Sequence, residues 1–539
     1  MAILPGGIRE VGMHSPVRPS IPVLIERLLE PAPYPHPTEA IRLVETHISW
    51  VILTGPFAYK LKKPVSLGFV DYTTLDLRRR SCEGEVRVSG RFAPELYVAA
   101  VPITGSVEAP CVGGEGEPIE YAVKLVQFDE ADRLDSRFVT GRLTAADCRA
   151  LGEAIAAVEE CLPAARRGDP WGTADSVFAA AAVNLAAIRT HFPEAAGRVD
   201  RLEGWLRRRL DAAAPLLVAR QAKGRVRECH GDLHLANIVL HDGRMTAFDA
   251  IEFSDNLRWI DVANDVAFLV MDLKARGRAD LAAEVVNSWV EATGDHGSLA
   301  VMPIYEAYRA IVRASIAAIR GGQGDGAARG EALEYLDLAE RLAVGEPPAM
   351  IVTCGMSGSG KSTVAAELVG PLAGVRIRSD VERKRLAGMR PTDRPADAVA
   401  TEALYHESCT RRVYDRLATL AGMVLDAGRT VVIDATCIKR WQRDRLAAVA
   451  LARGVPLIWV AFDLPTEAVL ARLATRQAAG GDPSDASVAV VRRQLAASEP
   501  LASEEAFGNA AIVRVAATDG PAEPAAVAER VVRARSMLP

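Results

Sequence analysis

A glycine-rich segment in the C-terminal part of the chain has the residue types and spacing that hold the phosphates of a nucleotide. It matches the pattern G-x-x-x-x-G-K-[ST] in full, after the strand-like run AMIVTC and before the helix-like run STVAAELV. Glycines let consecutive backbone N–H groups turn toward phosphate oxygens, and the N-terminus of the next helix adds positive dipole. The residues expected to contact the nucleotide are Gly355, Met356, Ser357, Gly358, Ser359, Gly360, Lys361, Ser362 and Thr363.

Three side chains at or near this loop carry chemistry of their own. Lys361 is expected to act in catalysis by reaching the β- and γ-phosphates, and Ser362 is expected to hold Mg²⁺. Asp434 ends the apolar run VVIDAT and fits the position of a carboxylate that holds the same Mg²⁺ through Ser362 or through water. A carboxylate that merely closes the turn after a strand is the alternative for Asp434.

Asp380 and two arginines complete this set. Asp380 ends the run VRIRSD, at the sheet edge where the phosphate loop begins, so it is expected to orient an acceptor hydroxyl and take its proton. It also has the residue type of a helix N-cap. Arg472 and Arg476 lie four residues apart before a Gly/Pro/Ser-rich stretch, where we expect a lid that closes on the transferring phosphate. The alternative is a solvated helix face.

A second constellation lies in the middle of the chain, in the string HGDLHLANIVL. Asp232 and Asn237 have the D-x₄-N spacing of a kinase catalytic loop, and Asp249 follows on a later strand-like run. Asp232 is expected to accept the proton of an attacking hydroxyl, while Asn237 and Asp249 hold Mg²⁺ on the ATP phosphates. His230 and His234 belong to this loop rather than to a metal-binding helix. Asp261 and Asp265, in the run IDVAND, are expected to brace the loop through hydrogen bonds.

The elements around these residues predict four regions. Residues 1–20 are expected to form a flexible tail, 21–344 one domain, 345–348 (GEPP) a linker and 349–539 a second domain. Over about 40–130 the strand-like runs and one helix predict an antiparallel sheet, followed by helices from 144 onward. After 349, strands and helices alternate, which favours a parallel sheet covered on both faces.

The string HGDLHLANIVL resembles the aminoglycoside phosphotransferase and choline kinase family, over about residues 40–300. The resemblance implies that Lys60 binds phosphate, that Glu85 is its ion-pair partner and that residues 123–130 contact adenine. Lys62 faces the same side as Lys60, so both lysines are candidates, and a basic edge strand is the alternative. Two features depart from protein kinases: no G-x-G-x-x-G loop is present, and the metal strand reads FDAIEF.

Residues of about 349–500 resemble the small P-loop kinases that include gluconate kinase, the kinase half of polynucleotide kinases and zeta-toxin-type kinases. That resemblance implies that Asp380 activates the acceptor and that Arg383 grips it. The whole chain resembles bacterial proteins that fuse an aminoglycoside-phosphotransferase-like domain to a P-loop domain. The expected fold is thus an α+β protein-kinase-like domain followed by an α/β P-loop kinase domain with a parallel sheet.

Composition narrows the classes of partner. The chain has 539 residues, 49% hydrophobic and 25% charged, with a net charge of −5. No basic stripe and only 5% aromatic residues argue against nucleic acid as a partner. The eight cysteines are scattered, and no signal peptide or membrane span is apparent, so a cytoplasmic protein is expected.

These observations lead to three hypotheses. The first is an ATP- and Mg²⁺-dependent kinase with two modules that phosphorylate a hydroxyl of a small metabolite, such as a sugar, amino sugar or nucleotide sugar. The second is a C-terminal kinase or ATPase regulated by a nucleotide-sensing, catalytically weak N-terminal domain. The third is a polynucleotide 5′-hydroxyl kinase. The sequence leaves the acceptor and the oligomeric state open.

Overall fold

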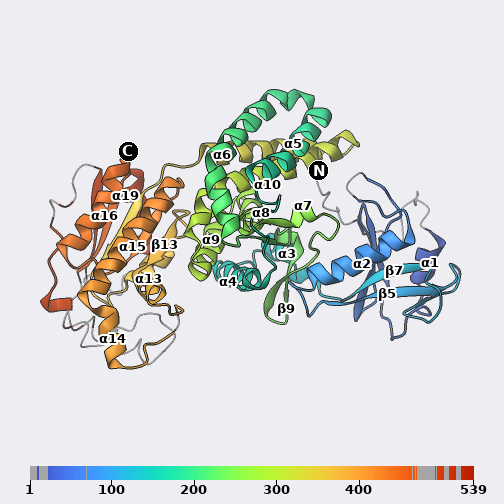
Figure 1. The fold of residues 1–539 in the computed structure, drawn as a ribbon, viewed down its shortest axis with the longest axis horizontal. Coiled ribbons are helices and arrows are strands. Elements are labelled where there is room, and N and C mark those ends of the chain that lie inside the picture. The colour runs from blue at the N-terminus through green and yellow to red at the C-terminus, as the bar shows by residue number, and fades with distance from the viewer. Residues whose placement is uncertain are drawn as a thin grey trace. The chain divides into compact units, whose positions relative to one another are not determined.

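The computed structural model divides into two compact units, each described here by itself (Figure 1). Unit 1 comprises Met1–Asp147, Ala154–Arg276 and Ile304–Ala343, and unit 2 comprises Cys148–Glu153, Gly277–Pro303 and Val344–Pro539. The structure describes residues 9–10, 22–67, 70–391, 393–463, 465, 467, 469, 492, 494–502, 505, 509–516 and 524–538.

Unit 1 begins with an antiparallel sheet whose strand order is β1-β2-β3-β4-β7-β5-β6. Consecutive residues of its inner strands alternate between two apolar clusters: Tyr59 and Ala122 belong to one, and Ala58 and Val123 to the other. This period of two is what a sheet covered on both faces requires. The strands are β1 (Arg9–Glu10), β2 (Arg42–Glu45), β3 (Ser49–Leu53), β4 (Phe57–Lys62), β5 (Tyr97–Gly105), β6 (Pro110–Val112) and β7 (Glu120–Val126).

Helix α2 (Leu75–Ser89) packs against β5 and β7, and the hydroxyl of Thr74 caps its N-terminus by accepting a hydrogen bond from the N–H of Leu77. The short helix α1 (Val23–Leu28) precedes the strand β2. The expected tail, residues 1–20, contributes the strand β1, and its other residues lie outside the described ones.

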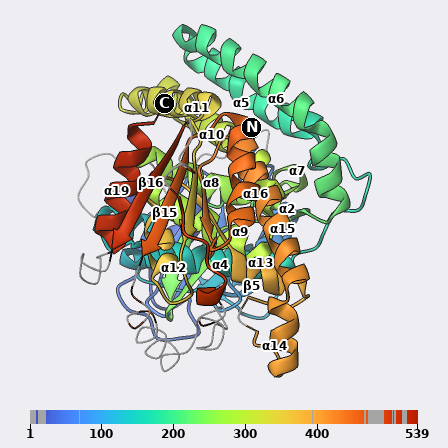
Figure 2. The ribbon, with the colours of Figure 1, turned by 90° about the vertical axis from the view of Figure 1, so that its left-hand side faces the viewer.

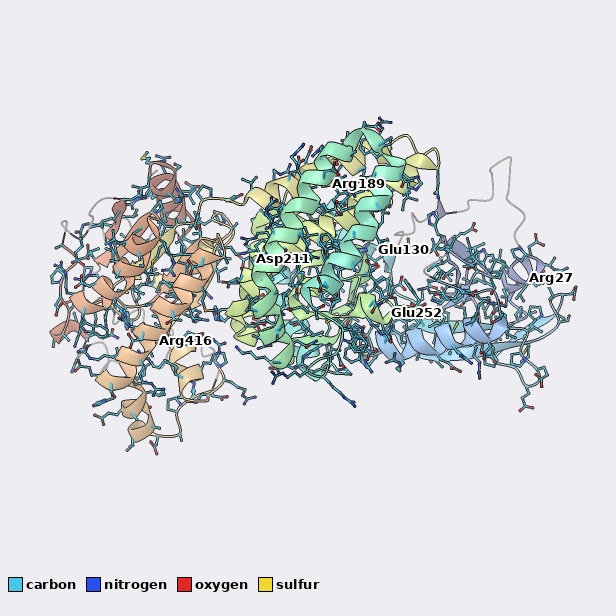
Figure 3. All side chains as sticks on the ribbon, turned by 45° about the horizontal axis from the view of Figure 1, so that its top comes forward. Arg27, Glu130, Arg189, Asp211, Glu252 and Arg416 are labelled. Atoms are coloured by element: carbon cyan, nitrogen blue, oxygen red, sulfur yellow. The ribbon has the colours of Figure 1, made fainter. Side chains whose placement is uncertain are left out.

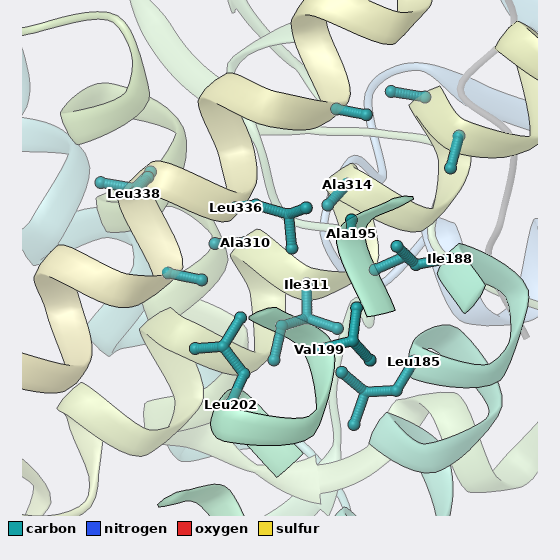
Figure 4. Packing of buried hydrophobic residues seen from close by; sticks show 14 of the residues in the cluster. Leu185, Ile188, Ala195, Val199, Leu202, Ala310, Ile311, Ala314, Leu336 and Leu338 are labelled. Atoms are coloured by element: carbon teal, nitrogen blue, oxygen red, sulfur yellow. The ribbon is translucent and has the colours of Figure 1, made fainter. Parts of the chain in front are cut away.

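The remainder of unit 1 is mainly helical, as its apolar periodicity predicts. Figure 4 shows Leu185, Val199, Ile311 and Leu336 meeting from four helices in one buried cluster. Two two-stranded ribbons, β9–β10 and β8–β11, interrupt the helices. The helices are α3 (Leu134–Val139), α5 (Ala174–His191), α6 (Ala196–Ala222), α7 (Asp255–Arg258), α8 (Val262–Ala275), α10 (Met302–Gly322) and α11 (Ala328–Val344). The ribbon strands are β8 (Val226–Glu228), β9 (Ile238–His241), β10 (Arg244–Ala247) and β11 (Trp259–Asp261).

Unit 2 is built on a parallel sheet with the order β13-β14-β12-β15-β16, which agrees with the predicted alternation of strands and helices. Helices α12 and α19 pack against each other on one face, and α15 and α16 on the other (Figure 2). The strands are β12 (Met350–Cys354), β13 (Val375–Arg378), β14 (Val431–Asp434), β15 (Leu457–Asp463) and β16 (Ala510–Ala516). The helices are α12 (Lys361–Glu367), α13 (Ser379–Leu386), α14 (Ala398–Tyr405), α15 (Glu407–Asp426), α16 (Arg440–Arg453) and α19 (Pro524–Ser536).

Unit 2 also contains segments that precede the expected linker. Helix α9 (Ala279–Thr293) and the 3₁₀ turn η4 (His296–Ala300) pack with it, next to β13 and α15 respectively. Residues 148–153, in the N-terminal part of helix α4 (Ala145–Cys161), belong to the same unit. Across the described part of the chain, no helix combines the length and the apolar character needed to cross a membrane.

Candidate active sites

The loop that carries Asp232 in unit 1 is held by carboxylates of helix α8. Asp265 accepts hydrogen bonds from the backbone N–H groups of His230 (2.8 Å) and Gly231 (2.9 Å). Asp272, about two turns further along α8, accepts from the N–H of Leu235 at 3.1 Å. These three bonds fix the backbone of the loop on both sides of Asp232. The sequence predicts this role for Asp265 but gives no signal for Asp272.

Asp261, which the sequence also places among the supports of this loop, has a different role. Its carboxylate forms a buried pair with Arg220 at 2.6 and 2.7 Å and caps α8 through the N–H of Ala263. The prediction was therefore wrong for Asp261, because an arginine from α6 occupies its oxygens. The loop receives a further bond from Arg309, which donates to the carbonyl of Gly231 at 3.0 Å.

Gly231 is required by the shape of this loop. Its φ is +83°, in the left-handed region, and an added Cβ would lie 2.7 Å from the carbonyl oxygen of Leu257. Asp249, on the opposite side of the site, is a non-glycine residue at φ +62°. Its N–H donates to the hydroxyl of Tyr97 at 2.9 Å, so the sheet fixes this strained residue.

The side chains of Asp232 and Asn237 meet as the D-x₄-N spacing predicts. The Asn237 amide nitrogen donates to both the carboxylate and the backbone carbonyl of Asp232, each at 3.0 Å. Burial alone would raise the pKa of Asp232, but His234, His230 and Arg313 outweigh it and lower the pKa to about 2. Asp232 is therefore a carboxylate, able to accept a hydrogen bond from an alcohol, at neutral pH.

A network of buried charges holds Lys60 in place. Lys60 donates to Glu85 of α2 at 3.0 Å and is also paired with Asp249. Burial alone would lower the pKa of Lys60, but Asp249 and Glu85 outweigh it and raise that pKa. The ion pair between Lys60 and Glu85 is the one that the resemblance to the phosphotransferases implies.

Lys62, the other candidate lysine, is more deeply buried than Lys60. Its side chain is 1% exposed and donates to Glu85 at 2.6 Å and to Glu252 at 2.5 Å. Figure 3 shows Glu252 beside α2, where Ser81 also donates to it at 2.8 Å. Burial alone would raise the pKa of Glu252, but Lys62 and Lys60 lower it to about 2. The two lysines therefore have different surroundings. Lys60 contacts Asp249 in the cavity, whereas Lys62 is buried and bonds to the other oxygen of Glu85.

These groups share one cavity of about 700 Å³ in unit 1. Lys60, Asp232 and Asp249 line it, and so do Gln127 and Phe128 of the segment expected to contact adenine. The side chain of Gln127 accepts a hydrogen bond from the N–H of Gly55 at 3.1 Å, which ties this segment to the turn between β3 and β4. The cavity therefore joins a nucleotide-sized space to a carboxylate suited to bind an alcohol.

In unit 2 the glycine-rich loop connects the central strand β12 to α12, as the sequence predicts. Gly355, Gly358 and Gly360 have φ values of +143°, +86° and +96°. A Cβ at Gly355 would lie 2.9 Å from the Cβ of Phe462, so the loop also passes close to β15. The Lys361 side chain is buried and donates to the carbonyl of Met356 at 2.5 Å, which keeps the amine within the curve of its own loop.

The neighbouring strand brings Asp434 to the same loop. The hydroxyl of Ser362 donates to Oδ1 of Asp434 at 3.1 Å, and the carboxylate is 5% exposed. Its Oδ2 is buried without a hydrogen-bond partner among the described residues. A buried carboxylate oxygen without a donor, beside a hydroxyl, is a set of hard oxygen ligands that fits Mg²⁺.

Asp380 and the glycine-rich loop line a second cavity, of about 210 Å³. Asp380 lies in the first turn of α13 rather than at its N-cap, which Arg378 occupies without a side-chain bond. Ser357 of the loop, Arg383, Lys439 and Trp441 also line this cavity. Arg383 donates to the carbonyl of Leu404 at 2.8 Å, and its buried Nε has no partner among the described residues.

Gln494 is a residue of this site that the sequence analysis missed. Its amide oxygen accepts from the N–H of Ser357 at 3.0 Å, and its amide nitrogen donates to the Ser357 hydroxyl at 3.1 Å. No pattern in the sequence marks it, because it follows the glycine-rich loop by more than a hundred residues. Arg472 and Arg476, predicted in a lid, lie outside the described residues. Thr363, like its neighbour Ser362, is exposed in the first turn of α12.

Comparison with known proteins agrees with both halves of this description. The model of the "Phosphotransferase enzyme family" matches residues 75–303, and that of an "AAA domain" matches residues 350–501. The uncharacterized protein Rv2004c of Mycobacterium tuberculosis is 30% identical over 458 residues, which are 80% of this chain and 89% of that protein. The uncharacterized protein Mb2027c of Mycobacterium bovis matches to the same extent.

Solved structures resemble each half separately. A choline/ethanolamine kinase family protein from Mesorhizobium loti is 16% identical, covers 57% of this chain and 89% of its own, and has a TM-score of 0.38. The Mycobacterium tuberculosis adenosine phosphosulfate (APS) kinase CysC is 16% identical, covers 35% of this chain and 99% of its own, and has a TM-score of 0.25.

The two folds and their matching families define this chain as an ATP-dependent kinase with two kinase-type domains in tandem. Its fold class is the predicted one, a protein-kinase-like α+β domain followed by a P-loop domain on a parallel sheet. The chain belongs to the family that contains the mycobacterial proteins Rv2004c and Mb2027c.

Proposed function

We propose that both domains transfer the γ-phosphate of ATP to a hydroxyl of a small metabolite, of the class of sugars, amino sugars and nucleotide sugars. One observation carries this proposal. In each unit a single cavity contains both a phosphate-binding group and a carboxylate suited to an alcohol: Lys60 with Asp232, and the loop residue Ser357 with Asp380. Phosphoryl transfer needs little more from a protein than this positioning and charge stabilisation.

In unit 1, Asp232 accepts a hydrogen bond from the attacking hydroxyl and takes its proton as the bond to phosphorus forms. Its lowered pKa keeps it ionised, and Asn237 keeps the carboxylate oriented. Lys60 leaves Asp249 for the phosphates when ATP enters, while Glu85 continues to hold its amine. The oxygens of Asn237 and Asp249 are the ligands that would hold Mg²⁺, whose charge stabilises the phosphates.

In unit 2, the backbone N–H groups of the glycine-rich loop and Lys361 bind the phosphates, and Asp380 takes the proton of the acceptor. Ser362 and Asp434 are the ligands that would hold Mg²⁺ there. Each metal site offers two protein ligands, and phosphate oxygens and water would supply the rest. Arg383 contacts the acceptor from the wall of the cavity, and Arg472 and Arg476 stabilise the transferring phosphate.

The test uses the full-length chain, labelled ATP and a panel of sugars, amino sugars and nucleotide sugars. We expect transfer to at least one acceptor, loss of one activity in Asp232→Asn and loss of the other in Lys361→Ala. Asp426→Asn, which removes an exposed partner of Arg453 in unit 2, serves as the matched charge control. The proposal fails if no acceptor is labelled, or if the double variant Asp232→Asn/Lys361→Ala labels acceptors as well as the wild-type chain.

A second function is favoured by one feature of unit 1. The turn between β3 and β4 contains Gly55 alone where protein kinases have a glycine-rich loop, and its N–H is bound to Gln127. The phosphates of a nucleotide in this cavity would therefore receive few hydrogen bonds from the backbone N–H groups of this turn. That would suit a domain that binds ATP without hydrolysing or transferring its phosphate. If so, Asp232→Asn leaves every transfer activity intact while Lys60→Met weakens ATP binding, and a large loss of transfer in Asp232→Asn excludes it.

A further inference from the structure

Helix α9 covers the open edge of the parallel sheet in unit 2. In the described part of the chain, strand β13 pairs with β14 alone, so its other side presents backbone groups that no strand pairs. The side chain of Asn287 accepts a hydrogen bond from the N–H of Arg376 in β13 at 2.7 Å. The backbone carbonyl of Glu291 accepts from Arg385 of α13 at 2.6 Å. Helix α9 is thereby attached both to the strand that precedes Asp380 and to the helix that contains it.

A chain of charges runs from this helix to the proposed Mg²⁺ ligands. The Glu291 carboxylate lies 3.2 Å from the guanidinium of Arg378 and 3.8 Å from that of Arg376. Nε of Arg378 lies 4.0 Å from Oδ2 of Asp434, the oxygen that has no hydrogen-bond partner among the described residues. Arg376 donates to the backbone carbonyl of Ser362 at 3.2 Å. Two arginines therefore stand between one glutamate and the metal side of the glycine-rich loop.

Arg378 lies between two carboxylates, and its position depends on both. At 3.2 Å Glu291 holds one end of the guanidinium, whereas Asp434 is just beyond hydrogen-bond distance. Loss of the Glu291 carboxylate would remove the nearer of these two anions. At this largely buried position, the attraction of the guanidinium to Asp434 is larger than it would be in water. A guanidinium on Asp434 would neutralise the carboxylate that Mg²⁺ needs.

We propose that Glu291 is a positioning residue of the P-loop site, which keeps Arg378 off Asp434 so that this carboxylate can bind the Mg²⁺ of Mg·ATP. The inference rests on the proposed role of Asp434 and adds a residue that belongs to neither the glycine-rich loop nor its flanking strands. Glu291 acts through Arg378 and touches neither nucleotide nor acceptor.

Glu291 lies close in the sequence to the residues that support the loop of Asp232. Helix α9 lies within residues 75–303, which match the phosphotransferase family, yet it packs with the P-loop unit. Helix α8, whose Asp265 and Asp272 hold the loop of Asp232, ends at Ala275, so only residues 276–278 separate it from α9. One nearly continuous stretch of chain thus supports the catalytic loop of one domain and the metal side of the other.

The experiment measures ATP binding to full-length Glu291→Gln by calorimetry over a series of Mg²⁺ concentrations and in EDTA. The heat of the P-loop site is the part that Lys361→Ala abolishes. We expect the half-saturating Mg²⁺ concentration to rise about tenfold, with ATP affinity in EDTA within twofold of wild type. The double variant Glu291→Gln/Arg378→Met should return the Mg²⁺ requirement to within threefold of wild type, because the competing cation is gone. Asp426→Asn is the control.

Three results overturn the proposal. The first is an unchanged Mg²⁺ requirement in Glu291→Gln. The second is an equal loss of affinity with Mg²⁺ and in EDTA, which indicates general damage to the loop. The third is a failure of Arg378→Met to restore the requirement in the double variant. If wild type itself gives no Lys361-dependent heat, the proposed function of the P-loop site fails first and this inference fails with it.

Discussion

The two proposed phosphate sites of this chain are built in opposite ways. The P-loop site takes its proposed phosphate-binding groups from consecutive residues, and the glycines at positive φ set their direction. The site of unit 1 brings together Lys60, Glu85 and Asp249, which are separated by up to 189 residues and are held by ion pairs. The first site therefore depends on local backbone shape, and the second depends on buried charge brought together by the fold.

The difference predicts which substitutions each site tolerates. A change within the glycine-rich loop acts mainly on the loop, since neighbouring residues supply most of the site. A change in the network of unit 1 also acts on folding, because Lys62, Glu85 and Glu252 are almost completely buried. Four measurements test this difference, one of catalytic activity and three of stability.

The largest expected effect is on transfer itself. Lys361→Ala should lower transfer by the P-loop domain roughly 10²–10³-fold, because it removes charge stabilisation of the phosphates. Asp232→Asn should lower transfer by unit 1 roughly 10²–10⁴-fold, because the amide cannot accept the proton. Each variant should leave the other activity within twofold, measured with the acceptor of each domain. If one variant abolishes both activities, the two sites do not work separately.

The second effect is on the free energy of unfolding, and it compares a buried lysine, Lys62, with its neighbour Lys63. Lys62→Met leaves two buried carboxylates, Glu85 and Glu252, without their shared cation, which should cost about 3–5 kcal/mol. Lys63→Met is the matched control: its partner Glu45 is half-buried, and its loss should cost below about 1 kcal/mol. Denaturant unfolding of full-length chains measures both. Equal costs would show that the buried network is not what holds unit 1 together.

The third effect tests whether the site of unit 1 also depends on local backbone shape. Gly231→Ala places a Cβ 2.7 Å from the carbonyl of Leu257, so the loop must shift. Gly243→Ala is the control, since its φ is also positive, at +75°, but nothing lies within 4 Å of the added Cβ. The control should lose about 1–2 kcal/mol from backbone strain alone, and Gly231→Ala about 1–3 kcal/mol more. Equal losses would mean that the loop accommodates the Cβ.

The contrast between the sites also explains what the sequence could and could not predict. The P-loop, the D-x₄-N pair and the parallel sheet were predictable, because each follows from residues close together or from a regular period. Glu85 was found only through a family resemblance. Asp272, Gln494 and Glu291 were missed because their partners lie far away in the sequence and a lone acid or amide carries no pattern.

Asp261 is a residue to which spacing alone assigns the wrong role. It precedes Asp265 by one helical turn, so spacing alone gives both the same role. The structure separates them because Arg220, from a helix that ends forty residues earlier, takes both oxygens of Asp261. Which carboxylate supports a loop is decided by the partner that the fold brings, and a single sequence does not contain that information.

The smallest effect concerns pH and the loop of Asp232. The pKa of Asp232 is lowered from 3.8 to about 2 in the folded chain, so its ionised form stabilises the fold. This contribution is complete well above pH 3.8 and is lost as the pH falls through about 2; at pH 3 about 1 kcal/mol of it is gone. Hydrogen exchange of residues 230–237 measures the free energy of opening of this loop. The difference in this free energy between wild type and Asp232→Asn should therefore shrink by about 1 kcal/mol between pH 5 and pH 3. The glycine-rich loop, residues 355–362, is the internal control and should show no difference between the two chains. A gap at residues 230–237 that stays constant or widens toward pH 3 would mean that Asp232 is not held ionised by its neighbours, and the site of unit 1 would then not depend on buried charge in the way that its ion pairs indicate.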